Sequence, residues 1–377
     1  MNHRTRYCHS LLFNTVDRIP LEPGKGREST MKRWQTEGLP THIRREEIAG
    51  YAYRQAGGTL EMPASGPQFP VNERMIPEFE EKIISRTERS QIVQDWKGNI
   101  CEISSDFELR HLRNAIDFVT RRWIKCPVEN RQDWQAMKRR YDINDPSRIP
   151  DLSDVDLDSL KNRQYPLTLQ FSGPFWQLRE WLGFENLCMM LHDDPALVEE
   201  MIEFWKEFVS ALLRKAFQFV VPDIVYISED MAYKGFSMIS PAMCRQFLLP
   251  CWTQWGQVIH SAGVPIYAID SDGFIGELIP LWIEAGINCC DPIEVAAGND
   301  ICAFRKEFGK QMAYRGGVDK RAMAAGGKTI EDEINRITPV IESGGYIPGC
   351  DHGVPHDVSW PNFVHYVRLL AQRTGWL

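Results

Sequence analysis

The sequence predicts an α/β fold of the (β/α)8 TIM-barrel class, with an N-terminal extension and a β-hairpin insertion. After residue 160, short apolar segments alternate with longer segments whose apolar residues recur at helical spacing, which is typical of parallel strands covered by helices. Six strands of this kind occur there and residues 19–22 supply another, which fits an eight-stranded barrel better than a small open sheet. A doubly wound sheet is the alternative, but no G-x-G-x-x-G follows the first strand and no phosphate-binding loop motif occurs.

We expect one domain over residues 1–377, and its first part, residues 1–160, is irregular. The elements expected in this part are a strand at 19–22, a glycine-containing turn at 24–27, helices at 44–56 and 132–141, and a β-hairpin at 82–103. The hairpin is indicated by alternating Ile and Val segments on both sides of the turn sequence Lys97-Gly98-Asn99.

The second part, residues 161–377, carries the regular repeats of strand and helix. Strands are expected at 166–172, 223–228, 265–270, 287–290, 311–315 and 345–348. Helices are expected at 195–219, 241–261, 276–285, 299–308, 329–343 and 360–374. The helix at 195–219 has a clear start, because Asp193-Asp194-Pro195 resembles an N-cap followed by proline in the first turn.

Composition argues against several classes of protein. The net charge of −8 is not that of a nucleic-acid-binding protein, which usually has a basic face. The ten cysteines are scattered without a C-x-x-C pair, which favours reduced thiols over a disulfide framework. The N-terminus lacks the apolar stretch of a signal peptide, and no apolar run approaches the ~20 residues that span a bilayer. We therefore expect a cytoplasmic protein with no membrane or nucleic-acid partner.

Ionisable and thiol side chains follow five successive strands of the predicted barrel. Catalytic groups of such barrels come from the carboxyl ends of the strands. The candidates at these positions are Glu229, Asp230, Asp270, Asp272, Asp291, Arg315, Cys350, Asp351, His352 and His356. For Asp230, Asp291 and Asp319 the simpler interpretation is a helix N-cap, where Asp is favoured.

Two of these groups point to particular chemistry. The carboxylates of Asp270 and Asp272, one residue apart, suit a cation or a shared proton. Thiolate, carboxylate and imidazole side chains in the segment that begins at Cys350 are the ligand types of catalytic zinc, and a buried structural cysteine is the alternative.

Two further residues are candidates for binding substrate. Arg315 suits recognition of a carboxylate or phosphate, and an ion pair with Asp291 is its alternative interpretation. Tyr267, late in its strand, lines a pocket or packs in the core. Asp291 itself is a substrate-binding candidate at the same set of strand ends.

Four segments carry a resemblance to a known family. They are Phe13-Asn14-Thr15-Val16-Asp17-Arg18-Ile19-Pro20, Asp270-Ser271-Asp272-Gly273, Arg315-Gly316-Gly317-Val318-Asp319 and Gly344-Gly345-Tyr346-Ile347-Pro348-Gly349-Cys350. Over nearly its whole length the chain resembles the uroporphyrinogen decarboxylase superfamily, (β/α)8 barrels that include true decarboxylases and corrinoid-linked methyltransferases. The true decarboxylases carry an R-Q-A-G-R segment after the first strand, where this chain has Gly24-Lys25-Gly26-Arg27. Arg27 is the substrate-binding candidate of that segment.

The resemblance also implies a metal site. The methyltransferases bind zinc through an H-x-C-G segment and a later P-G-C. Pro348-Gly349-Cys350 matches the second, and Asp270-Ser271-Asp272-Gly273 falls where the first would be. The implied ligands are Asp270, Asp272 and Cys350, with His352 as an alternative to Asp270.

Three hypotheses of function follow from these residues and the resemblance. The first is metal-assisted methyl transfer between a small substrate and a corrinoid carried by a partner protein, with Glu229, Asp270, His352 and His356 as catalytic groups. The second is a metal-free, uroporphyrinogen-decarboxylase-like lyase in which Asp270 or Asp272 stabilises a protonated intermediate. The third is a barrel that binds a tetrapyrrole or a corrinoid protein without catalysis.

Overall fold

Six parallel strands form the central sheet of the computed structural model, which describes residues 1–63, 66–114, 119–149 and 156–377. Their order across the sheet is β12-β11-β10-β9-β6-β5. The strands are β5 (Thr168–Ser172), β6 (Ile224–Ser228), β9 (Ile266–Asp270), β10 (Cys289–Asp291), β11 (Ala313–Val318) and β12 (Tyr346–Cys350). All six strands predicted after residue 160 are therefore confirmed.

Two extended segments flank this sheet and take the places of the remaining barrel strands. Beside β12, an isolated parallel bridge joins Gly26 to Val354, and beside β5 another joins Gln68 to Thr168. The barrel class is confirmed, but residues 19–22 do not form the regular strand that was predicted. Pro20 and Pro23 explain this, because proline has no N–H to donate to a neighbouring strand.

The N-terminal helix α1 (His3–Leu11) closes the end of the barrel where the strands begin. Its Tyr7 and Leu11 side chains, four residues apart, lie on one face of the helix. They pack against side chains that point into the barrel, namely Ile224, Ile266, Ala268, Cys289, Ala313 and Ile347. The helix was not predicted because its sequence is polar and basic apart from this pair.

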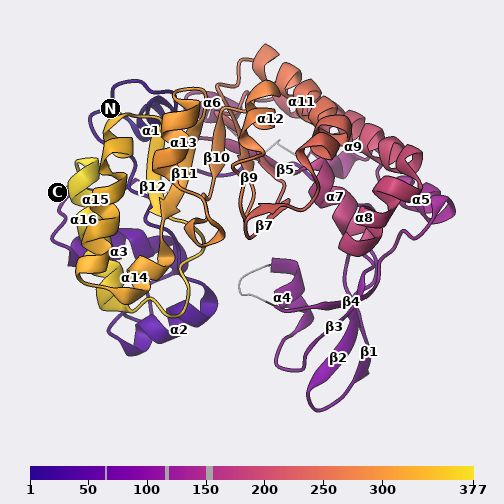
Figure 1. The fold of residues 1–377 in the computed structure, drawn as a ribbon, viewed down its shortest axis with the longest axis horizontal. Helices are drawn as coiled ribbons and strands as arrows, with labels where there is room; N and C mark the ends of the chain where they lie inside the picture. The colour runs from indigo at the N-terminus through magenta and orange to yellow at the C-terminus, as the bar shows by residue number, and fades with distance from the viewer. Residues whose placement is uncertain (64–65, 115–118, 150–155) are drawn as a thin grey trace.

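The outer layer consists of helices that cover the sheet (Figure 1). Its main members are α7 (Pro174–Leu182), α8 (Phe184–Asp193), α9 (Pro195–Phe217), α11 (Leu249–Ser261), α12 (Ile279–Glu284), α13 (Ile301–Phe308), α14 (Lys320–Ala325), α15 (Lys328–Glu342) and α16 (Trp360–Thr374). The start predicted for α9 is confirmed, because Asp194 accepts a hydrogen bond from the Leu197 N–H. Within the described ranges, no helix is both long and apolar enough to cross a membrane.

The helix predicted at 241–261 is interrupted. It consists of a short α10 (Pro241–Met243), a π-helical turn (Cys244–Leu248) and α11. Pro250 lies just beyond the π-helical turn, and its missing N–H removes one hydrogen bond of a continuous α-helix.

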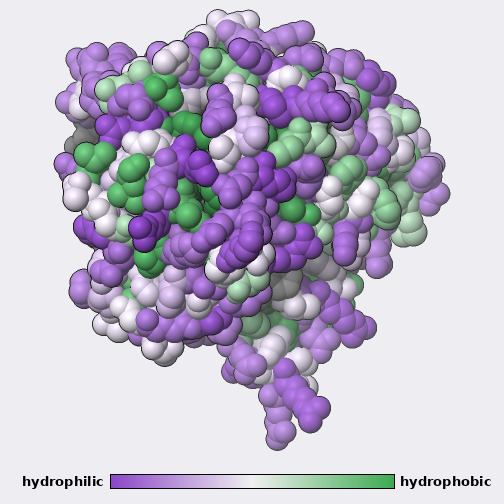
Figure 2. Space-filling view, turned by 60° about the vertical axis from the view of Figure 1, so that its left-hand side comes forward, coloured by the Kyte–Doolittle hydropathy of each residue, from purple (hydrophilic) through white to green (hydrophobic). Residues whose placement is uncertain are grey.

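A four-stranded antiparallel sheet forms an arm in the N-terminal part of the chain. Its strands are β1 (Lys82–Arg86), β2 (Ser90–Gln94), β3 (Ile100–Ser104) and β4 (Arg122–Lys125). The predicted hairpin is confirmed by β2 and β3. The arm projects from the body on the side away from α1, and its tip is hydrophilic (Figures 1 and 2).

Shorter helices complete this part of the chain. They are α2 (Glu28–Thr36), α3 (Ile48–Gln55), α4 (Leu109–Asn114), α5 (Arg131–Lys138) and α6 (Leu157–Lys161). The helices predicted at 44–56 and 132–141 correspond to α3 and α5.

Candidate active site

The register of the sheet aligns four polar side chains at the carboxyl ends of neighbouring strands. Ser172 pairs with Ser228, Ser228 with Asp270, and Asp270 with Asp291. Side chains alternate along a strand, and Ala268 and Cys289, two residues before the aspartates, point into the barrel. Asp270 and Asp291 therefore point to the interior as well. We call the polar groups around this end of the barrel the rim.

Asp291 is the centre of a network on the rim. Its carboxylate lies 3.3 Å from Arg315 Nη1 and accepts a 2.8 Å hydrogen bond from the Tyr226 hydroxyl. Arg315 also lies 3.4 Å from Glu22, which belongs to the extended segment beside β12. The ion-pair interpretation of Arg315 is therefore the one the structure shows.

Asp270 has carboxylate neighbours instead. Burial raises the pKa of Asp270 well above its usual value, and the charges of Asp291, Asp272 and Asp230 raise it further. Burial also raises the pKa of Asp291, but Arg315 and the Tyr226 hydroxyl oppose that shift. Arg315 thus favours the ionised form of Asp291, and Asp270 is the one of the two carboxyl groups with the stronger tendency to hold a proton.

Asp272 lies in a second network with His352 and Arg27. His352 Nε2 is 2.9 Å from the Asp272 carboxylate. His352 Nδ1 is contacted by two groups that only donate, the Gly353 N–H at 2.6 Å and the Arg27 guanidinium at 3.0 Å. Nδ1 is therefore the acceptor, and the ring proton lies on Nε2 and is donated to Asp272. Thus the structure brings three candidate residues together.

Cys350 does not join these groups. Ile347 on the same strand points into the barrel, so Cys350, three residues later, points to the outer layer, where it is part of the main hydrophobic core. Burial raises the pKa of its thiol, which disfavours the thiolate. Within the described residues no group of three or more His, Cys, Asp or Glu side chains is placed to hold a metal ion. The proposed zinc triad of Asp270, Asp272 and Cys350 is thus not assembled in the described structure.

Replacing Cys350 with alanine should leave the metal content of the purified protein unchanged and lower the free energy of unfolding by about 1 kcal/mol, the effect of a small buried cavity. Elemental analysis and urea unfolding measure the two quantities. Loss of a stoichiometric metal from the variant would show that Cys350 is a ligand after all.

Three other candidates lie away from the rim. The Glu229 carboxylate is fully buried and accepts hydrogen bonds from the Trp176 N–H at the start of α7 and from Trp252 Nε1. Tyr267 points outward and donates to the Trp252 carbonyl. His356 is exposed in the loop before α16, where its carbonyl accepts from Arg33. These hydrogen bonds join Glu229 to α7 and α11, Tyr267 to α11, and the His356 backbone to Arg33 of α2.

The sequence analysis missed several rim residues. Glu22 was assigned only as the last residue of a predicted strand. Because the ends of barrel strands form the rim, that position already indicates a rim side chain. Tyr226 occupies an inward position of β6, which the alternation of the strand could have shown. Tyr7 had no signal, because α1 was not predicted.

The segment after β9 is shaped by a close backbone approach. Gly273 has a φ of 83°, and a Cβ at this position would lie 2.4 Å from the Ala232 carbonyl carbon. Ala232 belongs to a small hairpin of β7 (Ala232–Tyr233) and β8 (Phe236–Ser237). Gly273 is therefore required by this hairpin.

Asp351 lies behind His352 and is fully buried. Its carboxylate accepts from the Val295 N–H at 2.9 Å and from the Lys320 N–H at 3.2 Å. Burial raises the pKa of Asp351 to about 6, although the charge of Lys320 opposes the shift. The two hydrogen bonds that the Asp351 carboxylate accepts tie the loop after β10 to the start of α14.

The Asp351 shift predicts a pH dependence of stability. Because the folded-state pKa lies above the ordinary value, the folded chain keeps a proton that the unfolded chain loses between about pH 4 and 6. Stability from this group should fall by roughly 2–3 kcal/mol as the pH rises through that window. Urea unfolding of the wild type and of Asp351→Asn tests this. As the pH rises through the window, the free energy of unfolding of the variant should increase relative to that of the wild type. A pH-independent difference would contradict the assignment.

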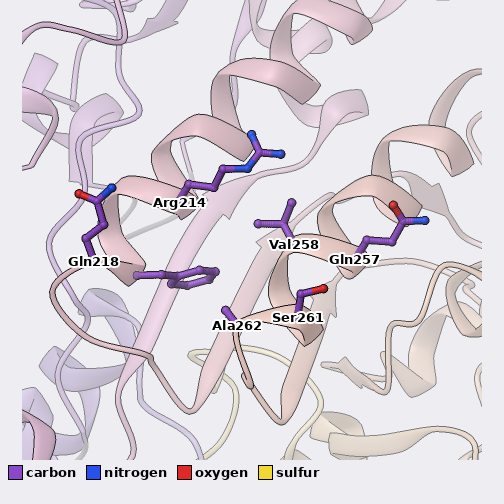
Figure 3. Close-up of a pocket in the computed structure, with 7 residues that line it drawn as sticks. Arg214, Gln218, Gln257, Val258, Ser261 and Ala262 are labelled. Carbon is purple, nitrogen blue, oxygen red and sulfur yellow. The ribbon is translucent and has the colours of Figure 1, made fainter.

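A shallow surface pocket lies at the other end of the barrel. It is lined by the end of α9 and the end of α11, including Arg214, Gln218, Gln257 and Ser261 (Figure 3). The ends of these helices lead into the starts of β6 and β9, so the pocket lies on the side opposite to the rim.

Comparison with known proteins identifies the family. A family model described as uroporphyrinogen decarboxylase (URO-D) matches residues 122–372, about two thirds of the chain. The chain belongs to the URO-D family. The URO-D match includes β4 and the whole central sheet, whereas Tyr7, Glu22 and Arg27 lie before it. No curated protein matches the sequence.

Two solved structures were compared with this chain. A methyltransferase from Methanosarcina mazei aligns over 99% of this chain and 99% of its own, with 13% sequence identity and a TM-score of 0.57. A B12-independent methionine synthase from Shewanella sp. W3-18-1, in complex with selenomethionine, aligns over 88% and 86% of the two chains, with 10% identity and a TM-score of 0.40. The first likeness shows a shared fold, and the second is too low to support a conclusion.

Proposed function

We propose that this URO-D family barrel is a methyltransferase that acts on a small substrate at the rim, with Asp270 as proton donor. The observation that carries the proposal is the Asp270–Asp291 pair, in which Arg315 and Tyr226 favour the ionised form of Asp291 and leave the proton on Asp270. The shared fold with a protein described as a methyltransferase supports the same class of reaction.

The transfer needs a proton because the group that loses the methyl is a poor leaving group. The heteroatom bearing the methyl group accepts the Asp270 proton. The bond from the heteroatom to the methyl carbon breaks, its electron pair goes to the heteroatom, and a bond forms between the carbon and an acceptor nucleophile. The demethylated substrate leaves with the proton, and Asp270 regains one from solvent.

The acceptor implied by the resemblance is a corrinoid carried by a partner protein, which would be presented at the open rim as a second substrate.

The resemblance also implies zinc, but the residues present do not fit a zinc site. The thiol of Cys350 points away from Asp270 and Asp272, so these residues do not fit a common zinc site and we derive no zinc-dependent step.

Decarboxylation of a polycarboxylate fits the rim less well. Such a substrate needs guanidinium groups free to bind it, but Arg315 is paired with Asp291 and Glu22, and Arg179 is paired with Asp230. Arg27, the other guanidinium near the rim, donates to His352, and the carboxylates of the rim would repel such a substrate.

A methyl-transfer assay tests the proposal. The protein is incubated with cob(I)alamin and a panel of methylated amines, alcohols and thioethers, and the visible spectrum reports formation of methylcobalamin. The reverse reaction starts from methylcobalamin and the demethylated compounds. We expect enzyme-dependent transfer with at least one substrate class. Transfer no faster than the enzyme-free background in both directions, together with release of CO2 from a carboxylated porphyrinogen, would overturn it in favour of the lyase.

A further inference from the structure

Polar side chains that face the barrel interior continue from Asp270 to the extended segment beside β5. On β5, Thr168 pairs with Ile224, which points into the barrel. Side chains alternate along a strand, so Gln170, two residues after Thr168, also faces the interior. Gln68 pairs with Thr168 through the isolated bridge, and its side chain reaches Gln170. The proposed reaction assigns no role to these two glutamines.

The two glutamines belong to a series of hydrogen bonds that leads to Asp270. Gln68 Nε2 donates to Gln170 Oε1 at 2.6 Å, and Gln170 Nε2 donates to the Ser228 hydroxyl at 2.8 Å. Ser228 pairs with Asp270 in the sheet, and its hydroxyl forms a hydrogen bond with the Asp270 carboxyl group. We call Gln68, Gln170 and Ser228 the amide network.

The direction of each bond in the amide network follows from what its groups can donate. An amide nitrogen only donates, so the Ser228 oxygen is the acceptor in the bond from Gln170. A hydroxyl group has a single proton, and the Ser228 proton is therefore available to Asp270. Gln68 occupies the carbonyl oxygen of Gln170 and so holds the amide with its nitrogen toward Ser228. The network thus supplies a donor to one oxygen of the Asp270 carboxyl group.

Core packing does not account for the glutamines of the amide network. The Gln68 and Gln170 side chains are both exposed, whereas Leu169 and Phe171, on the opposite face of β5, are 0% and 1% exposed. Exposed hydrogen bonds between neutral groups add little to stability, because water satisfies the same groups when the bonds are broken. We therefore look for the effect of the network at Asp270, where it ends.

We infer that Ser228 and Gln170 are positioning residues for Asp270 and direct its proton to the carboxyl oxygen that Ser228 leaves free. The oxygen that accepts from Ser228 becomes the carbonyl oxygen of the protonated group, since the O–H oxygen is the poorer acceptor. The proton then lies on the other oxygen, from which it can be donated to the heteroatom that bears the methyl group. This inference rests on the proposed function, because it orients the acid of that reaction.

Infrared spectroscopy tests the inference at the Asp270 carboxyl group itself. Ser228→Ala should move the Asp270 carbonyl stretching band to higher frequency, because a donated hydrogen bond weakens the C=O bond. Ser228→Thr keeps the hydroxyl group and should keep the wild-type frequency. The control Thr168→Val removes another interior-facing hydroxyl on β5 and should leave the band in place. An unshifted Asp270 band in Ser228→Ala would overturn the inference.

Steady-state kinetics give a second readout, which a loss of structure would not reproduce. Ser228→Ala should lower kcat for methyl transfer about tenfold and leave KM nearly unchanged, because the hydroxyl acts on the acid and not on the bound substrate. Gln170→Leu should lower kcat by a smaller factor, and Ser228→Thr should restore most of the loss. A rise in KM at constant kcat would show substrate binding instead and overturn the positioning role. Thermal melting confirms that each variant is folded.

The inference and the proposed reaction fail separately. A band shift in Ser228→Ala that Ser228→Thr reverses, without methyl transfer from any donor, would keep the orientation of Asp270 and refute the proposed reaction. Methyl transfer by the wild type, with neither the band nor kcat changed in Ser228→Ala, would refute the inference and keep the reaction.

Discussion

Replacing Asp270 with asparagine should lower kcat/KM for methyl transfer by about 10²–10⁴-fold, the usual contribution of a general acid. Asparagine keeps the size of the side chain and a hydrogen-bonding oxygen, but it has no proton to give to the leaving group. The measurement is the rate of methylcobalamin formation with a donor found in the substrate panel, under conditions where the wild type turns over.

Two comparisons make the Asp270 result specific. Asp332→Asn should keep wild-type activity, because its carboxylate lies in an exposed ion pair away from the rim. Asp291→Asn should also be impaired, since it removes the group that Arg315 and Tyr226 hold in place. An Asp270→Asn protein that keeps more than about a tenth of wild-type activity would mean that the proton comes from elsewhere.

Replacing Glu229 with alanine should lower the free energy of unfolding by about 3 kcal/mol or more. The buried carboxylate accepts from the Trp176 N–H at 3.2 Å and from Trp252 Nε1 at 2.9 Å. Its removal leaves both donors buried without an acceptor, and each such donor costs about 1–3 kcal/mol. Chemical denaturation measures the effect. The Glu229 carboxylate links α7 to α11 and is not part of the rim.

Glu229 also has a pH signature. Burial raises its pKa to about 8, so the folded chain keeps a proton that the unfolded chain loses above its ordinary pKa of 4.5. Stability from this group therefore falls as the pH rises from about 4.5 to about 8. Glu229→Gln, which cannot ionise, should be relatively more stable above that window than below it. The control Glu284→Ala breaks only an exposed pair with Arg245 and should leave the stability almost unchanged.

Gly173 offers a second test of the same contact. A Cβ at this position would lie 1.9 Å from the Glu229 carboxylate, so Gly173→Ala must displace Glu229 from its donors. We expect a destabilisation similar in size to that of Glu229→Ala, and a near-neutral result would show that the contact is loose.

The parallel repeats were predictable because buried strands and amphipathic helices leave strong periodic patterns. The six strands from β5 to β12 were located to within a few residues, and the aspartates at their ends followed from the barrel rule. The first barrel segment was not predictable in this way, because Pro20 and Pro23 prevent a regular strand while tertiary contacts with β12 still hold the segment in place.

The composition of the site was harder to predict than its location. Cys350 and Asp270 both stand at strand ends, but they point to opposite faces because Cys350 is an odd number of residues from the inward-facing Ile347. A shift of one residue along a strand therefore decides whether a side chain points into the barrel or into the outer core. Glu229 follows the inward-facing Ser228, and its carboxylate turns toward the start of α7.

Contacts across the barrel between distant segments could not be inferred without coordinates. The Asp272–His352–Arg27 network joins three parts of the chain that are separated by 80 and 325 residues. No local pattern marks such a contact, although each residue was chosen separately as a candidate.

The protonation state of Asp270 is the claim on which the proposed chemistry depends most directly. Infrared difference spectroscopy between the wild type and Asp270→Asn near neutral pH measures it, with Asp332→Asn as the reference for a change in an ionised aspartate. We expect the wild type to show the carbonyl stretching band of a protonated carboxyl group, which shifts in D2O and is lost in Asp270→Asn. A spectrum in which Asp270→Asn removes only carboxylate bands, as Asp332→Asn should, would contradict the account.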